Sequence, residues 1–239
     1  MLTMRHTKTL LSLAAVAMAP FALAATANAG TITVSGTAPT VDGGDIANLV
    51  DDTGGSPLWS DRNVIGQTFT TGATAGNLNA VTVLIVDADQ NPPADTIDGW
   101  KDWSLRFGTV DALPGTLTAV VDEIVRYTPD ASSPSYFTFT FDSPIALAAS
   151  TTYAFDVGVK GSENGWQAGI PQSRNSGDTY AGGQRYSGAK PQDFPNYSVS
   201  SQSGDMIFHA DITAIPEPAS LALAAFGLLG LIGFSRRRR

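Results

Sequence analysis

The 239-residue chain predicts an all-β fold, an antiparallel β-sandwich of jelly-roll type, from three observations. Short segments with a two-residue hydrophobic period recur along its middle, and clusters of Gly, Pro, Asn, Asp or Ser separate them. No window of ten or more residues between positions 30 and 215 combines helical spacing with a cap and a stop. Near each end of the chain lies a continuous apolar stretch without this alternation, at 9–25 and at 219–235, so the folded domain is expected between them.

Eight segments are predicted as strands because they are short, alternate in polarity and are rich in β-branched or aromatic residues: 31–35, 64–70, 80–86, 103–110, 117–126, 135–141, 152–160 and 206–213. Two of them carry the strongest apolar faces, which we expect to share a core: Phe137, Phe139 and Phe141 on one, and Tyr153, Phe155, Val157 and Val159 on the other. Trp103 lies in phase with Leu105 and Phe107, which places it in the core as well.

The first 29 residues predict a cleaved signal peptide. Basic residues precede an apolar stretch at 9–25, and Ala27 and Ala29 supply the small-x-small pattern that signal peptidase reads. Cleavage between Ala29 and Gly30 would then release the N-terminus of the mature protein. The alternative is an uncleaved N-terminal anchor.

The last 25 residues combine a short proline-flanked motif, an apolar run and a basic terminus. The uncharged run at 219–235 would form a transmembrane helix of about 26 Å, and the basic stop that follows would stay in the cytoplasm: Arg236, Arg237, Arg238 and Arg239. Together with Pro216, Glu217 and Pro218, this order resembles the PEP-CTERM sorting signal. The resemblance implies that a membrane-embedded exosortase recognises the motif on the outer side of the inner membrane. The alternative is a plain anchor that no enzyme cuts.

The chain therefore divides into a signal peptide at 1–29, an exported domain at 30–214 and a sorting signal at 215–239. Within the domain, segments 65–72 and 141–155 are similar to bacterial surface modules called choice-of-anchor domains. That resemblance implies a sandwich and a surface location, and it carries no activity. We expect export across the inner membrane, transient or permanent membrane anchoring, and then a place at the cell surface or in the extracellular matrix.

Composition excludes several classes of function. Between residues 30 and 215 the chain has 21 acidic and 8 basic residues, a net charge of −13, which is unsuited to nucleic acid. The chain contains no cysteine, which rules out disulfides, thiol nucleophiles and cysteine-based metal sites. His209 is the one histidine of this region, so a zinc site built from several histidines cannot form.

No catalytic residue is assigned, and the protein is not expected to be an enzyme. His209 lies on the more polar face of the predicted last strand, and no Gly-x-Ser-x-Gly elbow supplies a nucleophile for it. Glu123 and Glu163 are the only glutamates of the domain, and each is explained as an exposed strand or turn residue. A polysaccharide hydrolase needs two carboxyl groups with separated pKa values, which the sequence does not single out.

A Ca²⁺ loop is the one metal site that the sequence suggests. Five oxygen-bearing residues occupy positions 1, 3, 5, 9 and 12 of such a loop: Asp87, Asp89, Asn91, Asp95 and Asp98. Position 6, however, holds Pro92, which cannot adopt the positive φ of the usual glycine. A solvated acidic loop is therefore the favoured interpretation, and no other cofactor is predicted.

Three tryptophans are candidate glycan-binding residues. Trp59, Trp100 and Trp166 lie beside small or polar residues, and flat rings on loops can stack on sugar faces. The alternative is that they close the ends of a sandwich. The sequence as a whole predicts an exported structural or adhesive protein of the surface or matrix, with a carbohydrate-binding module as the alternative and a polysaccharide hydrolase third. Its expected partners are signal peptidase, an exosortase-type enzyme, the membrane before processing and extracellular polysaccharide.

Overall fold

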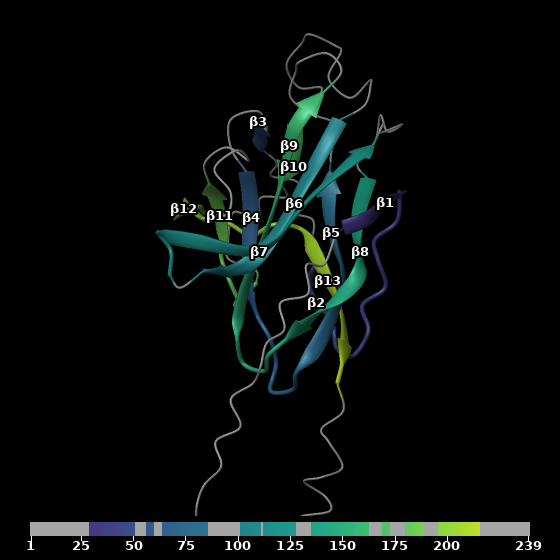
Figure 1. The fold of residues 1–239 in the computed structure, drawn as a ribbon, viewed down its shortest axis with the longest axis vertical. Coiled ribbons are helices and arrows are strands. Elements are labelled where there is room, and N and C mark those ends of the chain that lie inside the picture. The colour runs from purple at the N-terminus through teal and green to yellow at the C-terminus, as the bar shows by residue number, and fades with distance from the viewer. Residues whose placement is uncertain are drawn as a thin grey trace, which may run out of the picture.

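The computed structural model describes residues 29–50, 56–59, 64–85, 101–110, 112–127, 135–162, 169–172, 180–188 and 196–215 (Figure 1). In these ranges the chain forms thirteen β-strands and no helix. None of these residues therefore belongs to a helix long and apolar enough to cross a membrane. The all-β prediction is confirmed for this part of the chain.

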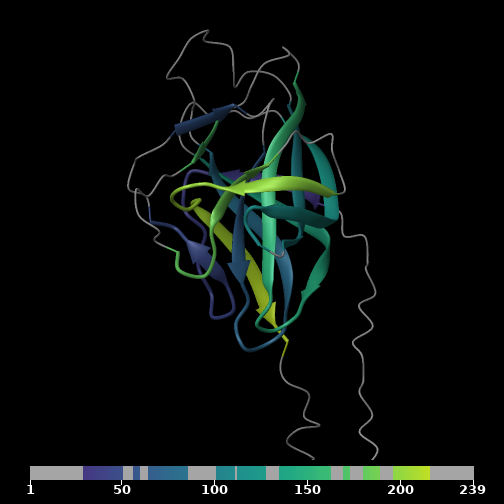
Figure 2. The ribbon, with the colours of Figure 1, turned by 90° about the vertical axis from the view of Figure 1, so that its left-hand side faces the viewer.

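One sheet has five antiparallel strands. Their order across the sheet is β1 (Ala29–Ser35), β8 (Ser135–Leu147), β5 (Gly76–Ile85), β13 (Phe208–Ala214) and β2 (Ile46–Asn48). The last strand in sequence, β13, thus lies inside the sheet, between β5 and β2. Figure 2 shows β13 running down toward the end of the domain.

Six further antiparallel strands close into a barrel. Their order is β4 (Val64–Thr70), β9 (Thr152–Ser162), β6 (Lys101–Val110), β7 (Gly115–Tyr127), β12 (Asn196–Ser201) and β11 (Arg185–Gly188), and β11 pairs again with β4. A separate two-stranded ribbon joins β3 (Ser56–Trp59) to β10 (Gly169–Gln172).

The main core lies between the five-stranded sheet and the barrel. Trp103 of the barrel contacts Phe137 of the sheet with ring centroids 5.1 Å apart, and Phe155 contacts Phe208 at 5.4 Å. Both apolar faces predicted to share a core contribute to it, and their buried members are these: Phe137, Phe139, Phe141, Phe155 and Val157. Trp103 packs there with Leu105 and Phe107, as predicted. Each fully buried Phe stabilises the fold by roughly 1.5–3 kcal/mol relative to exposure.

A second, smaller core fills the inside of the barrel. It consists of Val64, Val110, Leu117, Ala154, Tyr186 and Val199. On the same inward face of β6 and β9, Arg106 Nε donates to Asp156 Oδ1 at 2.9 Å, and both side chains are fully buried. The hydroxyl of Tyr186 lies 3.4 Å from the other oxygen of Asp156. Gly66 is required beneath that ring, because a Cβ there would stand 2.3 Å from Tyr186 Cζ.

The barrel corrects the prediction of a jelly-roll sandwich. In an open sheet, the face of β9 that carries Ala154 and Asp156 would be exposed to solvent. In this structure both residues are fully buried. The cause is closure by β11 and β12, whose Gly- and Ser-containing sequences gave no strand signal. The short strands β2, β3 and β10 were also missed. The eight predicted strands are all present; one has the predicted bounds, and seven begin or end at least two residues away from the predicted position.

Loss of the Asp156 carboxylate should strongly destabilise the protein. Asp156→Ala leaves Arg106 buried without its acidic partner, which typically costs roughly 3–5 kcal/mol. The double variant Arg106→Met/Asp156→Leu should recover most of this loss, because a buried ion pair can be replaced by apolar side chains of similar volume. Urea unfolding followed by circular dichroism measures both. A single variant as stable as the wild type would contradict the proposed importance of the pair.

Candidate functional site

The end of the folded domain is hydrogen-bonded to the chain that connects β4 of the barrel to β5 of the sheet. Ala214 is in register with Gly76, and the backbone N–H of Ile215 donates to the carbonyl of Ala75 at 2.9 Å. The described chain therefore stays bound to the sheet up to Ile215, one residue before Pro216. In Figure 1 this end of β13 lies at the bottom of the domain, which we call its base.

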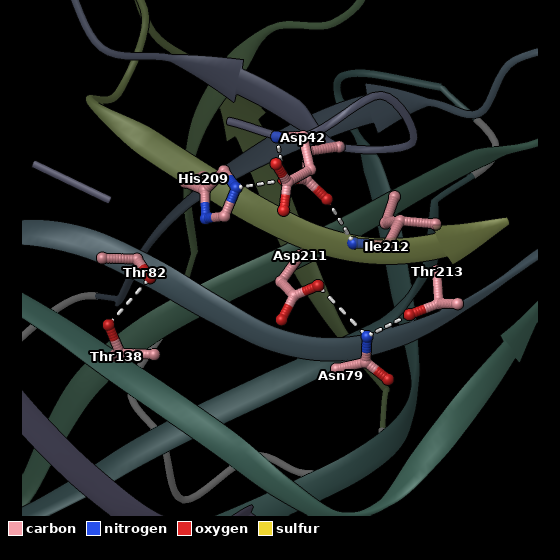
Figure 3. Close-up of polar contacts among 9 residues, drawn as sticks. Asp42, Asn79, Thr82, Thr138, His209, Asp211, Ile212 and Thr213 are labelled. Carbon is pink, nitrogen blue, oxygen red and sulfur yellow. Dashed lines mark hydrogen bonds and ion pairs between the residues drawn. The ribbon is translucent and has the colours of Figure 1, made fainter. Parts of the chain in front are cut away.

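Asp45 joins the chain between β1 and β2 to strand β13 through hydrogen bonds with Asp42, His209 and Ile212, which are labelled in Figure 3. One carboxylate oxygen accepts from His209 Nε2 at 2.9 Å and from the backbone N–H of Asp42 at 2.7 Å, and the other accepts from the N–H of Ile212 at 2.9 Å. The side chains of Asp45 and His209 are only 5% and 6% exposed. Strand β2 pairs with three residues of β13, the last of which is Ala210. Beyond them, Asp45 takes the place of a strand partner by accepting a hydrogen bond from the backbone N–H of Ile212.

The electrostatic setting of Asp45 favours its charged form. Burial by itself raises the pKa of this carboxyl, but the N–H groups of Asp42 and Ile212 and the side chain of His209 outweigh that effect and hold the pKa below its usual value. Thr82 of β5 is in register with His209, and its hydroxyl is hydrogen-bonded to that of Thr138 at 2.9 Å. Among the described residues, this is a structural cluster, because the Asp45 carboxylate, His209 Nε2 and the hydroxyls of Thr82 and Thr138 are hydrogen-bonded within the fold.

The sequence prediction for His209 is confirmed in part. His209 lies on β13, on the face opposite Phe208, Ala210 and Ile212, as the alternation predicted. It is buried, however, because the chain around Asp45 covers it. No sequence pattern links two residues that are 164 positions apart, so the pair could not be found without the fold.

A groove of about 480 Å³ opens beside this cluster at the base of the domain. Three segments form it: residues 43–47, the β4–β5 connection at 70–76, and the end of β13, with Tyr180 as an aromatic wall. The Tyr180 ring meets Phe208 edge-on at 5.3 Å, and its backbone N–H donates to Asp205 at 2.9 Å. Burial raises the pKa of the Tyr180 hydroxyl, which keeps it neutral. We call this feature the basal groove.

A second hollow of about 350 Å³ shares Thr70 with the basal groove. It is lined by Thr68, Thr152, Leu113 and the turn at 181–184, among others. The described residues that line the two hollows include one charged side chain, that of Asp45, and no Lys, Arg or His.

Most of the site residues predicted from sequence lie outside the described residues. This applies to the glycan candidates Trp100 and Trp166, the whole loop with Asp87, Asp89, Asn91, Asp95 and Asp98, the sorting motif Pro216, Glu217 and Pro218, the four terminal arginines and the apolar run 219–235. Trp59 ends β3, where it is in register with Gly169. Ala29 and Gly30 begin β1, so cleavage between them would shorten that strand by one residue. In the described part of the chain no three acidic or histidine side chains gather as a metal site.

The fold and its end define a class of protein: an all-β domain whose final strand, β13, lies inside a sheet and ends two residues before Pro216. Residues 214–239 match the PEP-CTERM protein-sorting motif, which identifies the chain as carrying the signal of an exosortase substrate. The motif implies export, anchoring in the membrane before processing by the membrane enzyme exosortase, and then delivery to the surface. A comparison with curated proteins finds no match. The resemblance of the domain to choice-of-anchor modules stays a prediction.

Replacement of Asp45 should weaken the fold in a pH-dependent way. Asp45→Asn loses a charged acceptor of three hydrogen bonds, and we expect a loss of roughly 1.5–3 kcal/mol near neutral pH. Because the pKa of Asp45 is lower in the folded than in the unfolded chain, its contribution is present above the unfolded value of about 3.9 and is lost as pH falls through the folded pKa.

Urea unfolding at neutral and acidic pH measures this difference. The gap between wild type and Asp45→Asn should shrink on acidification, whereas Asp142→Asn, at an exposed position of β8, should show little difference at any pH. An equal gap at all pH values would show that the charge of Asp45 does not stabilise the fold.

Proposed function

We propose that the protein is a structural or adhesive component of the cell surface or the extracellular polysaccharide matrix. The observation that carries the proposal is the PEP-CTERM motif at residues 214–239, which begins within the last strand of the fold. Acidic charge between residues 30 and 215 supports a place outside the cell, since it favours solubility and disfavours nucleic acid. The sorting signal gives the destination, and the β-domain is the part that stays there after processing.

The role proposed for the domain is binding or scaffolding, without catalysis and without a required cofactor. The one histidine between residues 30 and 215 is held by Asp45, and Asp45 is itself held by two backbone N–H groups. A general base needs access to a substrate proton, which these contacts do not leave. Ca²⁺ binding at residues 87–98 remains a prediction.

Processing of the C-terminus can be tested by intact-mass measurement of the protein from its native host. We expect a mature form that begins at Gly30 and ends near Pro218. Glu217→Ala should retain the apolar run and the terminal arginines, because it removes the charged residue of the sorting motif. Asp211→Asn, a change on β13 and outside the motif, also removes one negative charge; it is the matched control and should be processed like the wild type. A wild-type mass that includes Arg239 would reduce the tail to a plain anchor.

The structural or adhesive role is tested separately. Cells that lack the protein should retain less extracellular matrix after shear, and the wild-type gene should restore it while the Glu217→Ala variant should not. Unchanged matrix retention without the protein would argue against this role and leave the sorting result intact.

A further inference from the structure

The basal groove and the hollow beside it have the chemistry of a site for an uncharged polyhydroxylated ligand. We propose that they bind a short segment of a neutral polysaccharide. The inference rests on the proposed place of the protein at the surface or in the matrix, and it names the class of ligand for that setting.

Charge excludes other ligand classes first. Of the described side chains that line the two hollows, Asp45 is the only charged one, and His209 and two backbone N–H groups already occupy its oxygens. Phosphate, sulfate or carboxylate groups bind where Arg, Lys or clustered N–H groups oppose them, and none of the described lining residues has a cationic side chain. The net charge of −13 between residues 30 and 215 would also repel an acidic polymer.

The lining then favours a sugar over a purely apolar ligand. Thr74 is exposed and offers a hydroxyl group that can donate and accept a hydrogen bond, and the Thr70 hydroxyl is hydrogen-bonded to that of Thr152 at 2.9 Å and keeps the capacity for a further bond. Tyr180 is half-buried and lines the groove beside them with an aromatic ring, which suits the C–H face of a pyranose. That ring already packs edge-on against Phe208, so little side-chain entropy is lost on binding.

The dimensions fit a chain of sugars. A volume of about 480 Å³ lies within the usual range for small-ligand sites, and the second hollow of about 350 Å³ adjoins it, since both are lined by Thr70. Two open hollows that share a residue can accommodate successive units of a polymer. The end of β13 lines the groove, so a bound polysaccharide would lie close to the point where the sorting signal begins.

Gly43 and Gly72 line the basal groove at positions where the fold does not require glycine. A Cβ on Gly44 would stand 2.4 Å from the carbonyl oxygen of Ile212, so Gly44 is required for packing. A Cβ on Gly43 or Gly72 would meet no atom within 4 Å, and neither residue has a positive φ. Larger side chains at Gly43 and Gly72 can therefore fill the groove while the fold is preserved.

The test is affinity electrophoresis of the full chain, kept in a detergent without a sugar headgroup. The gels contain neutral polysaccharides (dextran, galactomannan or hydroxyethyl cellulose) or acidic ones (alginate or hyaluronate). We expect at least one neutral polymer to retard the wild type and no acidic polymer to do so. Gly72→Trp and Gly43→Trp should weaken the retardation at least tenfold, with an unchanged melting temperature.

Gly36→Trp is the matched control. Its Cβ would also meet no atom within 4 Å, but Gly36 does not line the groove, so its retardation should equal that of the wild type. The inference is overturned if no neutral polymer binds, if an acidic polymer binds instead, or if Gly36→Trp weakens binding as much as the groove variants. Any of these results would contradict the proposed glycan site. If C-terminal processing and matrix retention were normal in the same experiments, the proposed surface role would still be supported.

Discussion

Aromatic packing between the five-stranded sheet and the barrel is the interaction on which the rest of this structure depends. The chain has no cysteine, so no disulfide limits the unfolded state, and burial of apolar surface has to supply the stability. Phe208 of β13 contacts Phe69, Phe155 and Tyr180, with ring centroids 5.3–6.5 Å apart. The same rings that hold the two layers together also position the wall of the basal groove.

The position of β13 links this core to sorting. As a strand inside the sheet, β13 is hydrogen-bonded along its length to β5, and its pairing continues to the residue before Pro216. The folded domain and the sorting signal therefore share the end of one strand, with no spacer between them. The described contacts of β13 and of Ile215 all lie on the N-terminal side of Pro216.

The barrel interior shows a different use of polar residues. Arg106 and Asp156 face each other inside it, on two neighbouring strands, where they meet Tyr186. Burial of such a pair adds little net stability compared with apolar residues, but loss of either member is costly. By contrast, Arg126 and Asp102 form a short ion pair at the surface, at 2.7 Å, where solvent and salt reduce its contribution.

The sequence alone determined the destination of the protein and the class of its fold. A sorting signal and a signal peptide are linear patterns, and two-residue alternation places Phe137, Phe139 and Phe155 toward a core without knowledge of strand order. Tertiary structure decided what depends on contacts between distant segments. Closure of the barrel by β11 and β12, the Asp45–His209 pair and the basal groove each join residues more than 100 positions apart, which no local pattern encodes. The physical reason is that alternation reports which side of a strand faces a core, whereas pairing between strands decides how many cores there are and which hollows remain between them.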